Sequence, residues 1–266
     1  ASYIYNYNNH PYYWEAGNTY IATMKLRDPA AWYNLVVVYD SANSISTERI
    51  KLFINGTRIT DFSTYGGITL NQDSYWNSAT AHYISNTSSS SCIDGYLAEI
   101  VFIDGQALDP SSFAETNNSG IWIPKDVSGL TFGTNGFHIK GESASDLGND
   151  SSGNNNDFTT SGLSSDDQQP DSPTNNHCTW NPIEAETLIT YSNGNLAIAY
   201  SGSSGRNASR STIKIPASTD AFFEMVMTSN LGSGVDFFIG IEDGTAQSDN
   251  INSCLLYTSD AADDRV

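Results

Sequence analysis

Residues 49–60 read RIKLFINGTRIT, two short apolar runs joined by the pair Asn55-Gly56. A type I′ turn needs positive φ at both of its central residues, and Asn-Gly is a pair that adopts this conformation readily. Because apolar residues alternate on both sides of the pair, the stretch predicts an antiparallel β-hairpin with strands over 49–54 and 57–60.

Around this hairpin, β-branched and aromatic residues recur in short runs bounded by Asn, Gly, Asp and Ser, and helical periodicity is nearly absent. This pattern is typical of an all-β fold. It predicts a strand over 31–40 and a longer one over 92–105, which is apolar on both faces except at Glu99 and is therefore expected in the middle of a sheet. One brief helix is expected over 109–115, where a capping residue precedes Pro110.

A segment rich in Ser, Asn, Asp and Pro follows, between about residues 141 and 182. Such a composition indicates long loops. After it the β pattern resumes, and strands are predicted over 195–200, 211–215, 221–227 and 235–241. Four strands without a second layer indicate the beginning of another β-sandwich.

The chain of 266 residues carries 11 basic and 30 acidic side chains, a formal charge of −19. That balance argues against nucleic acid as a partner, because backbone phosphates must be neutralised by clustered Lys and Arg. Charged residues are only 15% of the chain, so its 36 Ser and 26 Asn supply much of the polar surface, which suits hydroxyl-rich or extracellular surroundings. No run approaches the roughly 18 apolar residues of a membrane helix, so membrane insertion is not expected.

Both ends of the sequence suggest a piece of a longer polypeptide. The N-terminus has neither an initiator Met nor the basic and apolar zones of a signal peptide. Residues 254–263, CLLYTSDAAD, are what results from translating a nucleotide string that resembles the transposon end and adapter of tagmentation sequencing libraries. Residues 254–266 are therefore expected to be an adapter-derived tail, and Cys254 is given no function.

Six stretches form an ordered set along the chain: RDPAAWY (27–33), RIKLFING (49–56), DGYLAEIVFIDGQAL (94–108), SGIWIP (119–124), LGNDSSGNNNDF (147–158) and DSPTNN (171–176). Together they resemble a family of bacteriophage virion proteins that carry a concanavalin A-like (laminin-G-like) lectin/glucanase domain. The resemblance covers about residues 25–182. It implies a jelly-roll β-sandwich, here truncated at its N-terminus, and a place on the virion, as in a tail fibre that meets the host envelope.

Residues 195–253 resemble the opening strands of a SPRY-type sandwich, so the partial second β-sandwich is expected to be of that type. The predicted organisation then has four parts: a laminin-G-like sandwich over 1–140, a Ser/Asn/Asp-rich loop and linker over 141–194, a truncated SPRY-like domain over 195–253, and the adapter-derived tail over 254–266.

Catalysis is not expected from the acidic residues. Sandwich glucanases of the same fold place closely spaced carboxylates on one face of a strand, as nucleophile and general acid, typically in a Glu-x-Asp-x-x-Glu pattern. The equivalent-looking strand here offers only Glu99, with Asp104 at the opposite parity, so Glu99 is expected to hold a neighbouring polar group or to lie at a sheet rim. Glu184 and Glu186 lie in a linker segment and are interpreted as solvated loop carboxylates.

A structural Ca²⁺ ion is one interpretation of the densest oxygen cluster. Residues 150–157 hold two carboxylates and three Asn in eight positions, and Ca²⁺ prefers six to eight such oxygen ligands. The alternative is a loop rich in Asx turns, in which the same oxygens bind backbone N–H groups. The candidate calcium ligands are Asp146, Asp150, Asn154, Asn156 and Asp157.

Carbohydrate binding needs an exposed aromatic ring, on which the C–H face of a sugar stacks, and planar polar groups for the hydroxyls. Two segments that look like loops offer this combination, and the alternative is that their rings lie in the core. The candidate residues are Tyr12, Tyr13 and Trp14 beside Glu15, and Tyr75, Trp76 and Asn77. The acidic surface favours neutral polysaccharide, because it repels sulfated or sialylated glycans unless Ca²⁺ bridges them.

The sequence thus favours a non-catalytic virion or tail-fibre module whose loops contact a host-surface glycan or neighbouring virion subunits. Two other functions stay open at this point. One is a polysaccharide hydrolase or lyase of the concanavalin A-like glucanase type, and the other is a purely architectural virion protein with no ligand.

Overall fold

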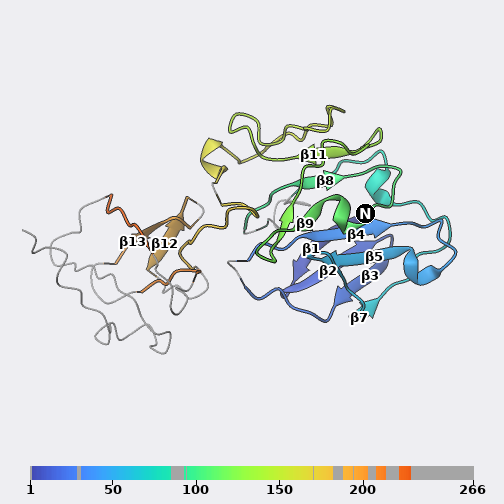
Figure 1. Ribbon diagram of the computed structural model, residues 1–266, viewed down its shortest axis with the longest axis horizontal. Helices are drawn as coiled ribbons and strands as arrows, with labels where there is room; N and C mark the ends of the chain where they lie inside the picture. Colours follow the sequence, from blue (N-terminus) through green and yellow to red (C-terminus); the bar gives the residue numbers. More distant parts are fainter. Residues whose placement is uncertain are drawn as a thin grey trace, which may run out of the picture. The chain divides into compact units, whose positions relative to one another are not determined.

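The computed structural model describes residues 2–28, 31–84, 93, 95–169, 171–181, 188–193, 195–202, 208–213 and 222–228. The chain divides into two compact units, Ala1–His177 and Cys178–Val266, and the division lies inside the segment 141–194 that the composition marks as a linker. Each unit is described by itself (Figure 1).

Four antiparallel strands form the first sheet, in the order β1-β2-β3-β7 (Figure 1). Two-residue turns join the first three strands, at Asn8-Asn9 and at Ala16-Gly17, and all four turn residues have positive φ. Such turns match the right-handed twist of the strands that they connect. The strands are β1 (Ser2–Tyr7), β2 (His10–Glu15), β3 (Asn18–Ala22) and β7 (Phe62–Tyr65).

This sheet corrects one expectation from the sequence. The segment around Tyr12 and Trp14 was expected to be a loop, but it is strand β2, paired with a neighbour on each side. Its burial alternates along the strand, because successive side chains point to opposite faces. The prediction failed because the segment lacks the Val and Ile that mark strands, and aromatic residues serve in their place.

The second sheet contains the predicted hairpin. Its strands are β4 (Leu35–Tyr39), β5 (Ile50–Ile54) and β6 (Thr57–Arg58), in that order. Asn55 has a φ of 47° and Gly56 a φ of 76°, as a type I′ turn requires. The hairpin is therefore confirmed, and the strand expected over 31–40 is confirmed over its second half.

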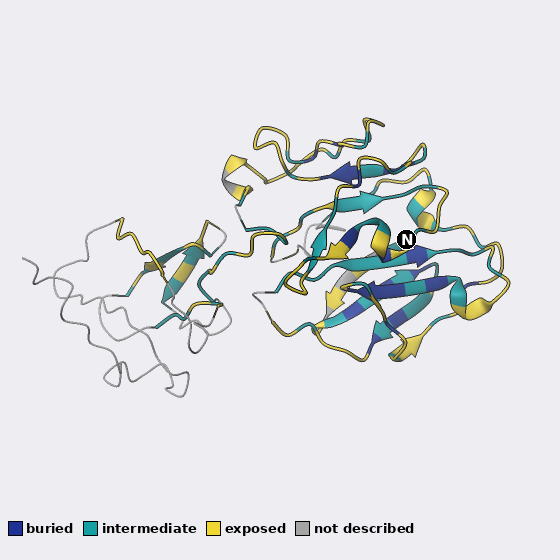
Figure 2. Ribbon diagram, viewed as in Figure 1, coloured by how far each residue is buried: buried dark blue, intermediate teal, exposed yellow. Residues whose placement is uncertain are grey.

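The inner faces of these two sheets form the hydrophobic core. Tyr13, Tyr20 and Ala22 of the first sheet pack in one cluster with Ile50 and Leu52 of the second, and none of the five is more than 2% exposed. The two sheets therefore pack face to face, and Figure 2 shows the buried residues concentrated along their strands. Each large apolar side chain buried in this way stabilises the fold by about 1.5–3 kcal/mol.

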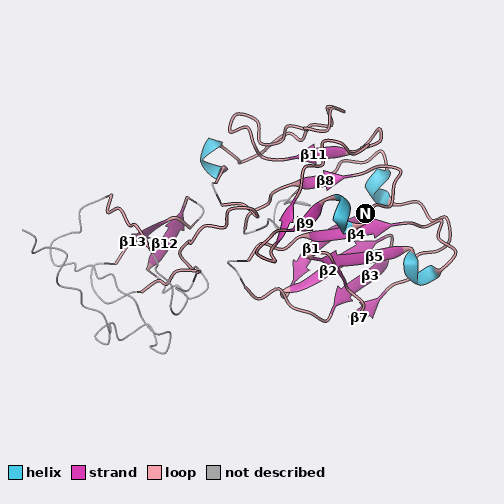
Figure 3. Ribbon diagram, viewed as in Figure 1, coloured by secondary structure: helices cyan, strands magenta, loops and turns pink. Residues whose placement is uncertain are grey.

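Two shorter strand pairs complete the first unit. They pair β8 with β11 and β9 with β10, and helical residues are confined to four short 3-10 turns among the described residues (Figure 3). The strands are β8 (Ile100–Phe102), β9 (Ala114–Thr116), β10 (Trp122–Pro124) and β11 (Phe137–Ile139), and the 3-10 turns are η1 (Ser46–Glu48), η2 (Tyr75–Asn77), η3 (Pro110–Ser112) and η4 (Ser165–Asp167).

The outer face of the second sheet is also covered. Val38 and Phe53 point away from the core cluster and are only 4% and 8% exposed. At the hairpin end of this sheet, the indole Nε1 of Trp122 donates a 3.0 Å hydrogen bond to Asn34 Oδ1. A Cβ atom at Gly56 would lie 2.8 Å from the same ring, so Trp122 closes tightly over the hairpin turn.

The long strand expected over 92–105 is a correction. Among the described residues only Ile100–Phe102 is strand, and it pairs with β11 alone. Glu99 has a φ of 52°, in the left-handed region, which interrupts the extended backbone directly before β8. The apolar pattern gave no sign of this break; residues 85–92 and 94 lie outside the described residues. The brief helix expected over 109–115 is the single 3-10 turn η3, with Pro110 at its start.

The second unit contains one described hairpin, β12 (Ile189–Ser192) with β13 (Ala197–Tyr200). Strand β13 confirms the strand expected over 195–200. Residues 222–228 form no strand, however, and the Phe222 ring is 89% exposed. Apolar and aromatic residues of this kind form a strand only where a neighbouring strand pairs with them. The strand predicted over 221–227 is therefore wrong for its described residues.

The strand expected over 211–215 is reduced to a single bridge in its described part. Ser211 makes a single β-bridge with Trp180, and 211–213 contain no further strand. The strand expected over 235–241 lies outside the described residues, as does the tail over 254–266. The described chain is thus all-β, in small antiparallel sheets. In this part of the chain, no helix has the length and apolar character needed to cross a bilayer.

Candidate functional site

Three planar polar side chains meet at one group of loops in the first unit. Asn77 Nδ2 donates a 2.6 Å hydrogen bond to Asp104 Oδ1, and Asn135 Nδ2 donates one of 2.7 Å to Asn77 Oδ1. The backbone N of Asn135 donates to Asp104 Oδ2 at 3.2 Å. Both Asn side chains are exposed and Asp104 is half-buried. We call Asn77, Asp104 and Asn135 the amide–carboxylate cluster.

Each member of the cluster lies at or close to the end of a regular element. Asn77 ends the turn η2, Asp104 lies two residues after β8, and Asn135 lies two residues before β11. Strands β8 and β11 are antiparallel neighbours, so the end of one lies beside the start of the other. The pairing therefore brings Asp104 and Asn135 together, and η2 adds Asn77 from a distant part of the sequence.

The loop after residue 150 supports the segment that carries Asn135. Asn154 Nδ2 donates to the carbonyl oxygens of Gly133 at 2.7 Å and Gly136 at 2.9 Å. Asn156 Nδ2 donates to the carbonyls of Thr134 at 3.1 Å and Gly136 at 2.9 Å. These four hydrogen bonds attach one loop to the other and limit the movement of the cluster.

Asp150 organises this supporting loop from within. Its buried carboxylate accepts hydrogen bonds from the backbone N of His138 and Ser152 at 2.8 Å and of Asn156 at 2.9 Å, and a fourth of 2.8 Å from the Ser152 hydroxyl. Burial raises the pKa of the carboxyl, but these hydrogen bonds outweigh it and hold the pKa of Asp150 below its usual value. Asp157 completes the loop by accepting from the backbone N of Asp150 at 2.8 Å.

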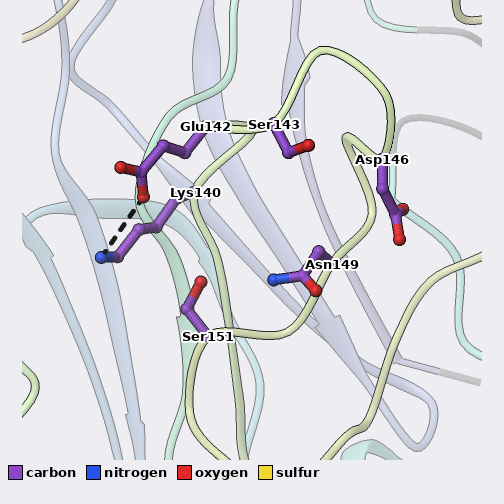
Figure 4. A pocket seen from close by; sticks show the side chains of 6 residues that line it. All are labelled: Lys140, Glu142, Ser143, Asp146, Asn149 and Ser151. Carbon is purple, nitrogen blue, oxygen red and sulfur yellow. Dashed lines mark ion pairs between the residues drawn. The ribbon is translucent and has the colours of Figure 1, made fainter.

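The structure separates the predicted calcium ligands into two groups. Asp150, Asn154, Asn156 and Asp157 share the supporting loop, where their side chains bind protein groups as Asx turns do. Asp146 instead lines a small pocket of about 160 Å³ (Figure 4). Within the described residues, no group of three or more His, Cys, Asp or Glu side chains is placed to hold a metal ion. Calcium at this loop stays a prediction.

The pocket that contains Asp146 is lined by polar residues. Lys140 Nζ lies 3.7 Å from a carboxylate oxygen of Glu142, and both side chains are exposed (Figure 4). Lysine and glutamate pairs of this kind contribute little to stability in water. The pocket is lined by Lys140, Glu142, Ser143, Asp146, Asn149 and Ser151.

The first predicted sugar-binding group lies in strand β2. Tyr13 is fully buried and its hydroxyl donates a 2.7 Å hydrogen bond to Glu15, so its ring belongs to the core, the alternative that the sequence had left open. Burial, and then the negative charge of Glu15, raise the pKa of Tyr13. Tyr12 and Trp14 point to the opposite face of the sheet and are half-buried.

The second predicted group forms the turn η2. Tyr75 is 47% exposed, Trp76 packs against the core cluster, and Asn77 belongs to the amide–carboxylate cluster. Sequence reasoning missed Asp104 and Asn135 as partners of Asn77. The available signal was that each precedes a glycine at the edge of an apolar run, after the run at Asp104 and before it at Asn135, which marks a turn at a sheet edge.

Glu99 has a polar partner, as the sequence led us to expect. Its Oε2 lies 2.6 Å from Nε2 of His138, which is 4% exposed and whose ring stacks on Phe132 with the planes 14° apart. Glu99 and Asp104 flank β8 and bind different partners, His138 and Asn77 respectively. Glu184 and Glu186 lie outside the described residues.

Comparison with protein-family models, with curated proteins and with solved structures found no significant match for this chain.

Proposed function

We propose that this chain is a non-catalytic carbohydrate-recognition module of a phage virion or tail fibre, and that the amide–carboxylate cluster contacts the sugar. The observation that carries the proposal is the hydrogen-bonded meeting of Asn77, Asp104 and Asn135. Amides both donate and accept hydrogen bonds and a carboxylate only accepts them, which together match the alternating donors and acceptors of vicinal hydroxyls.

The turn that carries Asn77 also carries a partly exposed aromatic residue. Tyr75 is two residues from Asn77 in the same 3-10 turn, and its ring is 47% exposed. A ring at the rim of a polar cluster gives the C–H face of a sugar a surface on which to stack, while the hydroxyls reach the amides. Of the segment Tyr75-Trp76-Asn77, the proposal therefore uses Tyr75 as the stacking ring and Asn77 as the polar group, because Trp76 is more buried.

The substrate class follows from charge. None of the three side chains of the cluster is basic, and the chain carries 30 acidic against 11 basic residues. Anionic glycans meet repulsion from such a surface, so neutral polysaccharide is the favoured ligand.

The resemblance to phage virion proteins supports the fold, the location and the partner that we propose for this module. A laminin-G-like jelly roll presents loops at the edge of its sheets, and the cluster here is built from loops and a 3-10 turn at the ends of strands. Within this proposal the first unit is that jelly roll, the particle surface is its location, and a host-surface glycan or a neighbouring virion subunit is its partner.

A polysaccharide array tests the proposal. The full chain and its Asp104→Asn variant are applied to neutral polymers (laminarin, mannan, dextran) and to anionic ones (alginate, heparin). We expect retention on at least one neutral polymer that falls about tenfold or more in the variant. Asp109→Asn is the matched control, because that exposed carboxylate makes no capping hydrogen bond.

Retention on the anionic polymers alone, or equal retention by Asp104→Asn and the unaltered chain, contradicts the proposal. Release of reducing ends from a bound polymer would favour the hydrolase instead. No retention on any polymer, with binding to virion subunits, would favour the architectural function.

A further inference from the structure

Glu15 is a carboxylate with no access to solvent, at the end of strand β2. Its side chain is 0% exposed and is one of the largest fully buried groups in the described chain. Removing a charged carboxylate from water costs several kcal/mol unless hydrogen bonds compensate for the lost hydration. A buried carboxylate therefore needs hydrogen-bond donors around it, and Glu15 has three.

The three donors come from two distant parts of the chain. The Tyr13 hydroxyl donates to Oε2 at 2.7 Å from the same strand. The Ser74 hydroxyl donates to Oε2 at 3.2 Å, and the backbone N of Tyr75 donates to Oε1 at 3.1 Å. Tyr75 is 60 residues from Glu15 in the sequence, so one buried carboxylate joins the core strand to the start of the turn η2.

The turn is also connected to Glu15 indirectly. Ser74 Oγ accepts a 3.1 Å hydrogen bond from the backbone N of Trp76 while its own proton points to Glu15. The Trp76 side chain packs against the core cluster that contains Tyr13, another donor to the same carboxylate. Ser74 therefore binds Glu15 directly, and Trp76 is joined to Glu15 through the Ser74 hydroxyl.

Turn η2 depends on such contacts for its conformation. It is one turn of 3-10 helix, three residues long, and a helix of that length has no independent stability in water. The residue at its end is Asn77, the member of the amide–carboxylate cluster that binds both Asp104 and Asn135. The position of the Asn77 side chain therefore depends on the hydrogen bonds that attach the start of the turn to Glu15.

We propose that Glu15 is a positioning residue, whose buried carboxylate fixes the Ser74–Asn77 turn to the core and so places the Asn77 amide against Asp104 and Asn135. The inference rests on the proposed function for its biological purpose, but the structural link is measurable without any sugar. Preorganised side chains bind with less loss of conformational entropy, so the link predicts tighter glycan binding than a loose turn allows.

Glu15→Gln is the variant that isolates the carboxylate. Glutamine keeps the volume and one acceptor oxygen, but its NH₂ group faces hydroxyls that now lack an acceptor. Tyr13→Phe removes only the shortest of the three hydrogen bonds and serves as the milder variant should Glu15→Gln fail to fold. Glu115→Gln is the matched control, because Glu115 is exposed on β9.

The experiment measures amide hydrogen exchange of the full chain, together with the side-chain amide resonance of Asn77. In Glu15→Gln we expect exchange about tenfold faster at residues 74–78, a smaller increase in Tyr13→Phe, a shifted Asn77 resonance, and unchanged exchange in β5. Unchanged exchange at 74–78, or an equal increase in β5, would overturn the inference, because Glu15 would then act on the core as a whole.

Sugar binding is a separate readout of the same variants. Faster exchange at 74–78 with retention on the polysaccharide array reduced in Glu15→Gln supports the inference and the proposed function together. Faster exchange in a protein whose unaltered form binds no polysaccharide keeps the positioning role of Glu15 and rejects the proposed function. Faster exchange with undiminished retention rejects the claim that the turn must be fixed for binding.

Discussion

The side-chain amide of Asn77 donates a 2.6 Å hydrogen bond to the carboxylate of Asp104, 27 residues further along the chain. The turn that carries Asn77 is attached to the buried Glu15, and Asp104 follows a strand that is paired with β11. Two independently supported segments therefore meet at this hydrogen bond. Such a meeting point keeps its geometry when a ligand arrives, which is what a recognition site requires.

Alkaline pH is expected to destabilise the protein through its buried tyrosines. Burial, and then the charge of Glu15, raise the pKa of Tyr39 to about 12, and burial raises the pKa of Tyr13 and Tyr20 as well. Unfolded tyrosines ionise near pH 10. The stability due to Tyr39 is thus complete below about pH 10 and is lost as pH rises towards about 12.

Absorbance of tyrosinate and unfolding by urea, both followed against pH, check this prediction. Tyr39→Phe should flatten the alkaline fall in the free energy of unfolding, although it also removes a 2.7 Å hydrogen bond to Gln72. Tyr83→Phe is the control, because Tyr83 is 65% exposed. A native protein whose tyrosines all ionise together near pH 10 would contradict the burial described above.

Gly56→Ala should lower stability more than Gly17→Ala. Both glycines have positive φ, 76° and 88°, which costs an alanine about 1–2 kcal/mol. Only at Gly56 would the new Cβ also meet a side chain, the Trp122 ring at 2.8 Å, whereas nothing lies within 4 Å at Gly17. We expect a further loss of about 1–3 kcal/mol at Gly56, measured by urea unfolding.

Equal losses in the two alanine variants would show that Trp122 does not close over the hairpin turn. Gly17→Ala thus isolates the backbone contribution, and the difference between the variants reports the packing alone.

Asp150→Asn should loosen the supporting loop. An amide replaces one acceptor oxygen by a donor, so it faces N–H and O–H groups that lose their partner, at a cost of about 1–3 kcal/mol. The lowered pKa of Asp150 means that its contribution is present above the ordinary value near 3.9 and is lost as pH falls through the lower folded value.

Thermal unfolding between pH 2 and pH 7 checks this, with the exposed Asp146→Asn as control. The Asp150→Asn protein should lose part of the acid dependence that the unaltered protein shows. An unchanged melting temperature and acid dependence would mean that the four hydrogen bonds to Asp150 contribute nothing to stability.

Calcium is tested on the same loop. The four hydrogen bonds to Asp150 occupy about as many positions as a carboxylate offers to donors, so an ion must displace some of them. We expect the same melting temperature in millimolar Ca²⁺ and in EDTA. A rise with Ca²⁺ that Asp150→Asn abolishes would instead establish the calcium site predicted from the sequence.

The sequence predicted those parts of the fold whose conformation is set by residues adjacent in the chain. Asn55-Gly56 specified its hairpin because both φ angles of the turn are set by these two residues. The turns at Asn8-Asn9 and Ala16-Gly17 carry a weaker form of the same signal, and the aromatic strands between them were mistaken for loops. The break at Glu99 has no local signature and was missed for that reason.

The candidate site depends on tertiary contacts and was only half predicted. Asn77 was identified because an exposed aromatic residue lies beside it, but Asn135 is 58 residues away and meets it only after β8 and β11 have paired. Glu15 was noted as a neighbour of sugar-binding rings, whereas its partner Tyr75 lies across the core. Pairings of this range follow from the packed sheets and not from spacing in the sequence.

The most direct test of carbohydrate recognition follows the side-chain amide resonances of Asn77 and Asn135 while neutral oligosaccharides from laminarin, mannan or dextran are added. The proposal predicts that at least one of them shifts both resonances, and that Asn77→Ala weakens its binding about tenfold or more. Asn118→Ala, in the exposed turn between β9 and β10, should bind as the unaltered chain does. Resonances that stay unmoved by all three sugars, or an equal Kd in Asn77→Ala, would contradict it.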